Sequence, residues 1–287
     1  MAAGARGTDA ARLEAEWARR VRDNREQVER IRHGPERPDF YAPVSAHFID
    51  DPRRTGDAVL DALLELGRPD ESWLDIGAGA GRYALPLALR VREVLALDPS
   101  QAMLEGLRAG MAEHGIHNVR VLEGRWPDAA GPNLAADVAL IAQVGYDVER
   151  IGPFLGAMEA AARRLCVAVL MDRSPAAAAD GFWPVVHGVQ RVLLPALPEL
   201  VTLLRARGTE PMVRELRRPE RRFDSAEETL GYLRRQLWAE EGTDAEARLL
   251  AEVERRMAAG WDARSLDDGP SRIGLVTWRP SRLAPTV

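Results

Sequence analysis

The sequence predicts an α/β protein built on a mostly parallel sheet of seven strands, with helices on both faces. Two features predict this fold class. From residue 71 onward, short apolar runs alternate with helical patterns, as in successive βαβ units. The first of these runs passes directly into a glycine-rich loop, and a helix follows at once. The chain has 287 residues, of which 46% are hydrophobic, so it can bury one large core.

Seven apolar runs have the length and composition of strands. They lie at residues 72–76, 93–98, 119–123, 137–142, 165–171, 212–216 and 273–278. Helical patterns separate most of these runs, at residues 80–90, 101–113, 150–164 and 196–207. The interval between the last two strands is too long for a simple loop, so it must hold further structure.

Two capping boxes lie in that interval. In Ser225–Glu228 and Thr243–Glu246, a hydroxyl and a carboxylate three residues apart can satisfy the free N–H groups at a helix start. They predict two inserted helices, at residues 226–240 and 244–259. We therefore expect a helical insert at residues 223–262, before the last strand.

An N-terminal helical cap is expected over residues 1–66. Residues 1–9 are small and polar and are expected to be disordered, whereas apolar residues recur at helical spacing from Leu13 to Ile31. A second helical pattern covers residues 58–66. The main domain, with its insert, is then expected at residues 67–287.

Composition excludes several classes of chemistry. The formal charge of −5 and the pI near 5.7 argue against nucleic acid as a partner. Cys166 is the single cysteine, so no intramolecular disulfide can form, and a reducing, cytoplasmic setting is expected. All 39 basic residues are arginine, which excludes lysine-dependent mechanisms. No apolar run is long enough to cross a membrane, and no metal site is expected.

The loop after the first strand has the composition of a cofactor site. Asp75 is followed by three alternate glycines, Gly77, Gly79 and Gly81, with Ala78 between the first two. Glycine lets the backbone turn sharply and approach a ligand, and the helix that follows offers free N–H groups. A dinucleotide fingerprint would place another glycine at position 82, where Arg82 stands. The spacing therefore favours S-adenosylmethionine over NAD.

The second strand ends in Asp98, about 20 residues past the loop, where a ribose needs a carboxylate acceptor. We expect Asp98 to take that role. Pro99 follows it and Met103 lies one turn into the next helix, where it can contact the adenine or pack in the core.

Taken together, residues 74–81 and 96–104 resemble motif I and its successor in class I S-adenosylmethionine-dependent methyltransferases. The resemblance covers about 200 residues, counting the strand order through Trp278. It implies a seven-stranded sheet whose last strand is antiparallel. It also implies that Asp75 and the loop backbone lie near the methionine moiety of the cofactor.

The segment after the third strand departs from that family. Members often carry Gly-Asp there for the adenine amino group, but this chain has Gly124 and Arg125. An arginine cannot accept the adenine N–H, so the contact passes to Asp128, to the backbone of Trp126 or to no residue. Trp126 itself can stack on the adenine or close the core.

The methyl acceptor is expected at the end of the fourth strand, where ligands bind in open α/β folds. Gln143 is expected to contact the cofactor there, and Tyr146 the substrate. Asp147 and His187 are the candidate catalytic bases. Each has a structural alternative, because Asp147 can cap the next helix and His187 lies in an apolar stretch.

A lid is expected over this edge of the sheet. The pair Phe40 and Tyr41 resembles the aromatic lid of many small-molecule methyltransferases, with Tyr41 toward the cofactor and Phe40 toward the substrate, although it can equally dock the cap on the core. Trp238, in the insert, is a further candidate substrate contact. Deletion of residues 1–42 is expected to leave a folded domain that still binds the cofactor.

Three functional hypotheses follow from the sequence. The first is methyl transfer to a small molecule that the cap and the insert enclose. The second is an RNA or protein methyltransferase, and the third is a non-catalytic partner subunit with the same fold. An exposed, reactive thiol would be needed for methylation of pyrimidine C5, and Cys166 lies inside a predicted strand.

Overall fold

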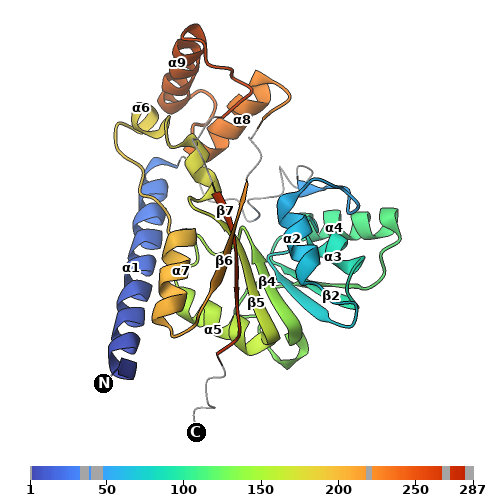
Figure 1. Cartoon of the computed structure of the whole chain (residues 1–287). Coiled ribbons are helices and arrows are strands. Elements are labelled where there is room, and N and C mark those ends of the chain that lie inside the picture. The colour runs from blue at the N-terminus through green and yellow to red at the C-terminus, as the bar shows by residue number, and fades with distance from the viewer. Residues whose placement is uncertain (1, 33–38, 40–47, 218–221, 267–271, 282–287) are drawn as a thin grey trace.

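The computed structural model describes residues 2–32, 39, 48–217, 222–266 and 272–281. Seven strands form one sheet in the order β3-β2-β1-β4-β5-β7-β6 (Figure 1). The bounds are β1 Ser72–Ile76, β2 Glu93–Asp98, β3 Val119–Glu123, β4 Ala136–Ala142, β5 Ala162–Met171, β6 Met212–Arg217 and β7 Arg272–Trp278. Strands β1 to β5 pair in parallel, and β7 is antiparallel to both β5 and β6. The predicted fold class and the antiparallel last strand are confirmed.

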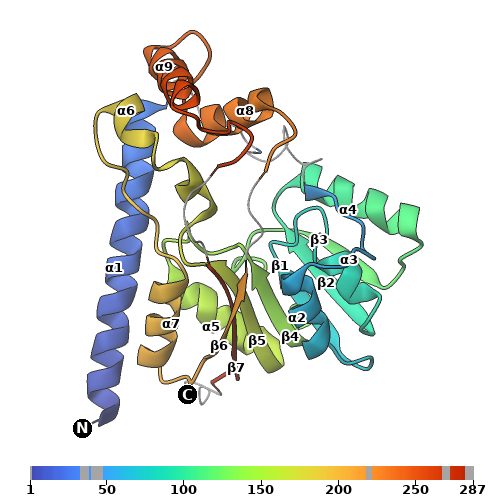
Figure 2. The ribbon, with the colours of Figure 1, turned by 45° about the horizontal axis from the view of Figure 1, so that its top comes forward.

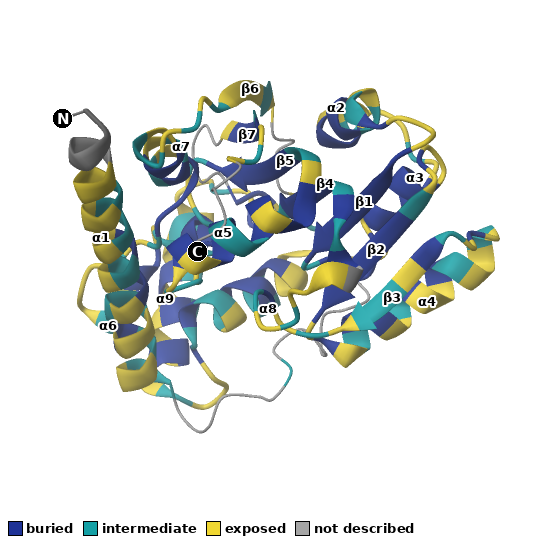
Figure 3. Ribbon diagram, turned by 90° about the horizontal axis from the view of Figure 1, so that it is seen from below, coloured by how far each residue is buried: buried dark blue, intermediate teal, exposed yellow. Residues whose placement is uncertain are grey.

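Helices cover both faces of the sheet. On one face, α2 (Ala58–Leu66), α3 (Ala84–Ala88) and α4 (Gln101–His114) bury their apolar residues against β1, β2 and β4. On the other face, α1 (Ala2–Ile31), α5 (Ile151–Ala161) and α7 (Leu197–Ala206) do the same. Figure 3 shows the central strands β1, β2, β4 and β5 buried between these layers, with β6 exposed. Strands β2 and β4 are almost wholly apolar because both of their faces are covered.

A third apolar cluster lies outside the sheet layers. It joins η3 (Pro175–Ala179) and α6 (Trp183–His187) to the inserted helices α8 (Ala226–Leu237) and α9 (Asp244–Ala258). Figures 1 and 2 place this cluster beyond the carboxyl ends of the parallel strands. The insert therefore stands over the edge of the sheet at which ligands bind in such folds.

Both predicted capping boxes start the inserted helices. The N–H of Glu228 donates to Ser225 Oγ at 3.1 Å, and the N–H of Glu246 donates to Thr243 Oγ1 at 3.2 Å. In turn, the carboxylates of Glu228 and Glu246 accept the backbone N–H groups of Asp224 and Gly242, each one residue before the cap. Each reciprocal pair satisfies donors that the helix leaves free.

The N-terminal segment is not a separate cap. Helix α1 begins at Ala2, so the expectation of disorder over residues 1–9 is wrong for the described part of that segment. Trp17 and Val21 of α1 are buried against α5 and α7, whereas α2 packs on α3 at the opposite face. The first two helices are thus built into the two layers of the main domain.

Helix α3 is shorter than the sequence predicts. It spans Ala84–Ala88 instead of residues 80–90 and has no side-chain cap at Tyr83. The glycine loop occupies the positions before it, and Pro86 lies at its centre and supplies no backbone N–H. The short helix leaves the loop free to form the turn described next.

Candidate functional site

The glycine loop turns sharply from β1 toward α3. The N–H groups of Gly77 and Ala78 both donate to Leu97 O, at 2.7 and 3.0 Å, which ties the loop to the end of β2. Gly77, Gly79 and Gly81 have φ values of +76°, +56° and +89°, a backbone region that side chains disfavour. Glycine is required at these positions by the course of the backbone.

The three glycines differ in what lies beside them. A Cβ at Gly77 would stand 2.5 Å from Val144, and one at Gly81 would stand 2.5 Å from Leu107. These two positions are filled by the chain itself. A Cβ at Gly79 would meet only Met103 Sδ, at 3.9 Å. The backbone of Gly79 therefore faces space that a ligand can enter, as an adenosine cradle requires.

Asp98 lies directly beside Gly79. Its Oδ2 accepts the N–H of Gly79 at 2.9 Å, and its Oδ1 accepts the N–H of Ser100 at 2.8 Å. Burial raises the pKa of Asp98, whereas these two hydrogen bonds lower it. Each carboxylate oxygen keeps a second lone pair, so the group can still accept ribose hydroxyls.

A second carboxylate adds to the negative charge around Asp98, which we call the acidic rim. Asp39 accepts a hydrogen bond from Ser100 Oγ at 2.7 Å, and its charge is a further cause of the raised pKa of Asp98. Arg125 acts in the opposite direction. Arg125 and Pro99 are both exposed, so Arg125 lies beside the acidic rim with its side chain in solvent.

Asp75 is the most buried of the acidic residues at the site. It is 2% exposed and lies one residue before the end of β1. Burial, and then the charge of Asp98, raise the pKa of Asp75 to about 7. A carboxyl group with such a pKa responds strongly to a cation placed next to it.

Two expected adenine contacts are buried. Met103 is 3% exposed and lies beside Gly79. Trp126 is 7% exposed, belongs to the core cluster of α1, α5 and α7, and donates from Nε1 to Phe154 O at 3.1 Å. Its indole closes the core, as the alternative interpretation of the sequence had it, so stacking on an adenine would require the ring to leave that cluster.

Gln143 and Tyr146 lie together at the carboxyl end of β4. Tyr146 is buried, donates its hydroxyl to Gln143 Oε1 at 2.7 Å and accepts the N–H of Met171 at 2.8 Å. Gln143 has φ of +58°, and such left-handed geometry in a non-glycine residue recurs at functional sites. Tyr146 therefore fixes the end of β4 to the end of β5.

The two candidate bases lie in different surroundings. Asp147 is exposed, and it does not cap α5, whose N-cap residue is Arg150. His187 lies in the cluster of the insert, with Nε2 2.7 Å from Leu237 O and its ring centroid 4.6 Å from that of Trp183. Burial lowers the pKa of His187, which keeps it neutral as a packing residue.

Trp238 is the one expected lid residue that the described part of the chain includes. Trp238 ends α8 in the left-handed conformation, and the guanidinium of Arg32 lies 5.7 Å from its ring centroid. It thus packs toward the end of α1. Phe40 and Tyr41 lie outside the described residues.

Two polar groups at this edge were not among the predicted site residues. Arg82, at the position where a dinucleotide fingerprint has glycine, pairs with Asp50 and Asp57. Asp172, just past β5, has an Oδ1 atom that solvent does not reach and that has no hydrogen-bond partner. A carboxylate at the end of a predicted strand was the signal that pointed to Asp98, and the same test applied to β5 would have found Asp172.

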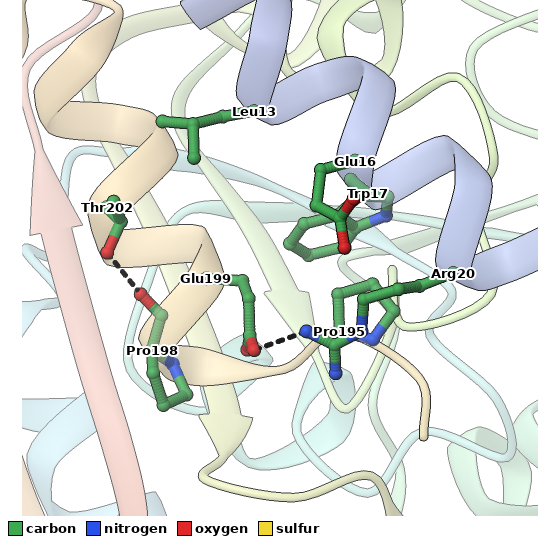
Figure 4. A pocket seen from close by; sticks show the side chains of 8 residues that line it. All are labelled: Leu13, Glu16, Trp17, Arg20, Pro195, Pro198, Glu199 and Thr202. Carbon is green, nitrogen blue, oxygen red and sulfur yellow. Dashed lines mark hydrogen bonds and ion pairs between the residues drawn. The ribbon is translucent and has the colours of Figure 1, made fainter. Parts of the chain in front are cut away.

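A groove between α1 and α7 is unrelated to this site. Figure 4 shows it lined by residues of α1 and of the start of α7, among them Trp17 and Thr202, with Arg20 paired to Glu199. It lies on the α5 side of the sheet, and the α3 side carries the glycine loop. The groove holds none of the predicted site residues.

Comparison with known proteins identifies the domain. Residues 74–177, which contain the glycine loop, Asp98 and the end of β4, match the sequence model of a methyltransferase domain. This segment is similar in sequence to methyltransferase domains, and the fold around it is that of the class I methyltransferases. The YcgJ protein of Bacillus subtilis has the same fold, with a TM-score of 0.54, 17% identity and coverage of 77% of this chain and 98% of that one. A methyltransferase of Geobacter sulfurreducens, solved with S-adenosylhomocysteine, has a TM-score of 0.52 and 16% identity, over 84% of this chain and 97% of that one.

Curated relatives match this chain over shorter segments. A probable cobalt-precorrin-6B C(15)-methyltransferase of Methanothermobacter thermautotrophicus is 30% identical over 111 residues, covering 36% of this chain and 57% of that protein. A tRNA/tmRNA (uracil-C(5))-methyltransferase of Ectopseudomonas mendocina is 39% identical over 61 residues, covering 21% of this chain and 17% of that protein. The chain thus spans less than two thirds of each relative. The described residues contain no helix long and apolar enough to cross a membrane.

Proposed function

We propose that this protein transfers the methyl group of S-adenosylmethionine to a small-molecule acceptor. The observation that carries the proposal is the open side of Gly79, between Met103 Sδ and the carboxylate of Asp98. The loop leaves space where a nucleoside can lie and presents an acceptor for its ribose hydroxyls. S-adenosylmethionine supplies a methyl group on a positively charged sulfur.

Each acidic residue would have a separate task. Asp98 would accept the ribose hydroxyls, because its oxygens stand at Gly79 and Ser100 and keep free lone pairs. Asp75 lies in β1, two residues before Gly77, and would face the positively charged methionine part of the cofactor. The Asp39 carboxylate, through Ser100, adds to the negative rim that favours a cation.

Beyond binding of the cofactor, catalysis requires that the methyl acceptor be held in position and that water be excluded. Transfer from sulfur is an in-line displacement, so holding the acceptor against the methyl group supplies much of the rate. The insert, with α8 and α9, stands over the carboxyl edge of the sheet where that acceptor would lie (Figure 2). Its own apolar cluster buries Leu233 and Leu237, so it is a packed body and can keep a fixed wall over the site.

Methylation of RNA at uracil C5 is disfavoured by the single cysteine. Cys166 is fully buried in β5, and burial raises the pKa of its thiol. A thiolate nucleophile for that chemistry must be exposed and acidic. The net charge of −5 also opposes binding of RNA.

The test is calorimetric titration with S-adenosylhomocysteine, followed by incubation with tritiated S-adenosylmethionine and fractions of a cell extract. We expect binding, and label in the low-molecular-mass fraction. Label in the RNA or protein fraction would show a macromolecular acceptor instead. Absence of binding would refute the cofactor assignment itself.

A further inference from the structure

One carboxylate oxygen at the carboxyl edge of the sheet, where the methyl acceptor would lie, has no hydrogen-bond partner. The Oδ1 atom of Asp172 is shielded from solvent and has no partner. Buried polar atoms are satisfied in native proteins with few exceptions, and an exception calls for a functional or solvent explanation. Glu246 Oε1 has no hydrogen-bond partner either, but the guanidinium of Arg234 stands beside it.

The position of Asp172 is fixed from two sides. Its N–H donates to Arg272 O at 3.0 Å, which holds it at the start of β7. The preceding residue, Met171, donates its N–H to the hydroxyl of Tyr146, which in turn donates to Gln143. Asp172 therefore lies at the carboxyl end of β5, next to the strained end of β4 and on the side of the sheet edge that the insert covers (Figure 2).

Other acidic and basic groups near this edge are already engaged or face solvent. Asp180 pairs with Arg173 and Arg191, at 3.0 and 3.3 Å. His187 is held by Leu237 O inside the insert, and Asp147 is exposed. Among these groups, Asp172 alone combines a shielded acceptor atom with a place at the end of a central strand.

We propose that Asp172 binds the methyl acceptor directly, accepting a hydrogen bond from its N–H or O–H group and taking that proton as the methyl group is transferred. The inference rests on the proposed function and names the acceptor class as an amine, an amide, an alcohol or a phenol. The acceptor heteroatom forms a bond to the methyl carbon with its own electron pair. The carbon–sulfur bond breaks, its pair stays on sulfur as a neutral thioether, and the proton passes to the carboxylate of Asp172.

The test compares Asp172→Asn with Glu210→Gln, a change at an exposed carboxylate before β6 that lies outside the site. Three quantities are measured: the melting temperature of the free protein, the affinity for S-adenosylhomocysteine and the transfer of tritium to the extract fraction that the wild type labels. For Asp172→Asn we expect an unchanged melting temperature, because the Oδ1 atom has no hydrogen-bond partner to lose and the amide is of similar size, and an affinity within twofold of wild type. We expect transfer to fall by about 100-fold or more, the usual effect of losing a general base.

The control and a second variant keep the test decisive. Glu210→Gln should transfer at the wild-type rate, and Asp172→Glu, which keeps a carboxylate, should be more active than Asp172→Asn. A lower melting temperature for Asp172→Asn with transfer retained would overturn the proposal, because the residue would then be structural. If the wild type binds S-adenosylhomocysteine but methylates carbon, the proton-accepting role fails while the proposed function stands.

Discussion

The raised pKa of Asp75 makes the affinity for S-adenosylmethionine depend on pH. In the free protein, burial and the charge of Asp98 bring the pKa of Asp75 to about 7. The ligand is a cation at sulfur and nitrogen, so the bound state favours the charged carboxylate. Below pH 7, binding must first remove a proton from Asp75. The affinity is therefore full at alkaline pH and is lost as the pH falls through about 7.

The size of this effect follows from the pKa. We take Asp75 to be charged in the complex at every pH. Binding at pH 6 must then remove the proton that Asp75 carries in the free protein, so the affinity at pH 6 is about 10-fold lower than at pH 8, a difference of about 1.4 kcal/mol. Calorimetric titration at pH 6, 7 and 8, in buffers of different ionisation enthalpy, measures both the affinity and the protons released. Asp75→Asn should bind more weakly and show no pH dependence over this range. Equal wild-type affinities at pH 6 and pH 8, with no proton released, would refute the reasoning.

Further predictions concern the loop, the first helix and the stability of the free protein. Gly79→Val and Asp98→Ala should weaken S-adenosylhomocysteine binding by about 10- to 150-fold, which corresponds to roughly 1.5 to 3 kcal/mol, whereas Gly131→Ala, at an open surface position, should bind as wild type. Wild-type affinity in both site variants would place the ligand elsewhere. Deletion of residues 1–42, in contrast to the expectation from sequence, should give an insoluble or molten protein by circular dichroism, because two core residues leave with α1; a cooperative melt would contradict this. A raised pKa favours the fold at low pH, and this contribution is lost as the pH rises through about 7, so Asp75→Asn should melt higher than wild type at pH 8 and similarly at pH 5.

The sheet could be predicted from sequence because its signal is local. The central parallel strands β1, β2, β4 and β5 are largely buried and therefore appear as apolar runs, and all seven predicted strands are present within a few residues of their predicted bounds. The turn at Gly79 and the carboxylate of Asp98 are also local, since strand, loop and helix follow one another in the chain. The geometry on which the proposed cofactor site rests could therefore be predicted from sequence.

The acceptor side could not be predicted in this way. Whether Trp126 faces a ligand or the core depends on α5, whose Phe154 carbonyl accepts its indole N–H from 28 residues away. Trp238 likewise depends on Arg32, at the other end of the sequence. Whether Asp172 Oδ1 has a hydrogen-bond partner depends on all the segments that surround it, so no sequence pattern within β5 could predict that it lacks one.

The position of α1 has a consequence for how the protein is made. Trp17 donates from Nε1 to Val148 O, and Arg20 pairs with Glu199, so the partners of α1 lie 131 and 179 residues later in the chain. At typical rates of synthesis, roughly 5 to 20 residues per second, the first helix waits about 10 to 40 s before α7 exists. During that interval the part of its apolar stripe that packs on α7 has no surface to bury against. Helix α1 thus completes its docking long after it is synthesised, and nascent chains stalled before α7 should engage chaperones that bind exposed apolar helices.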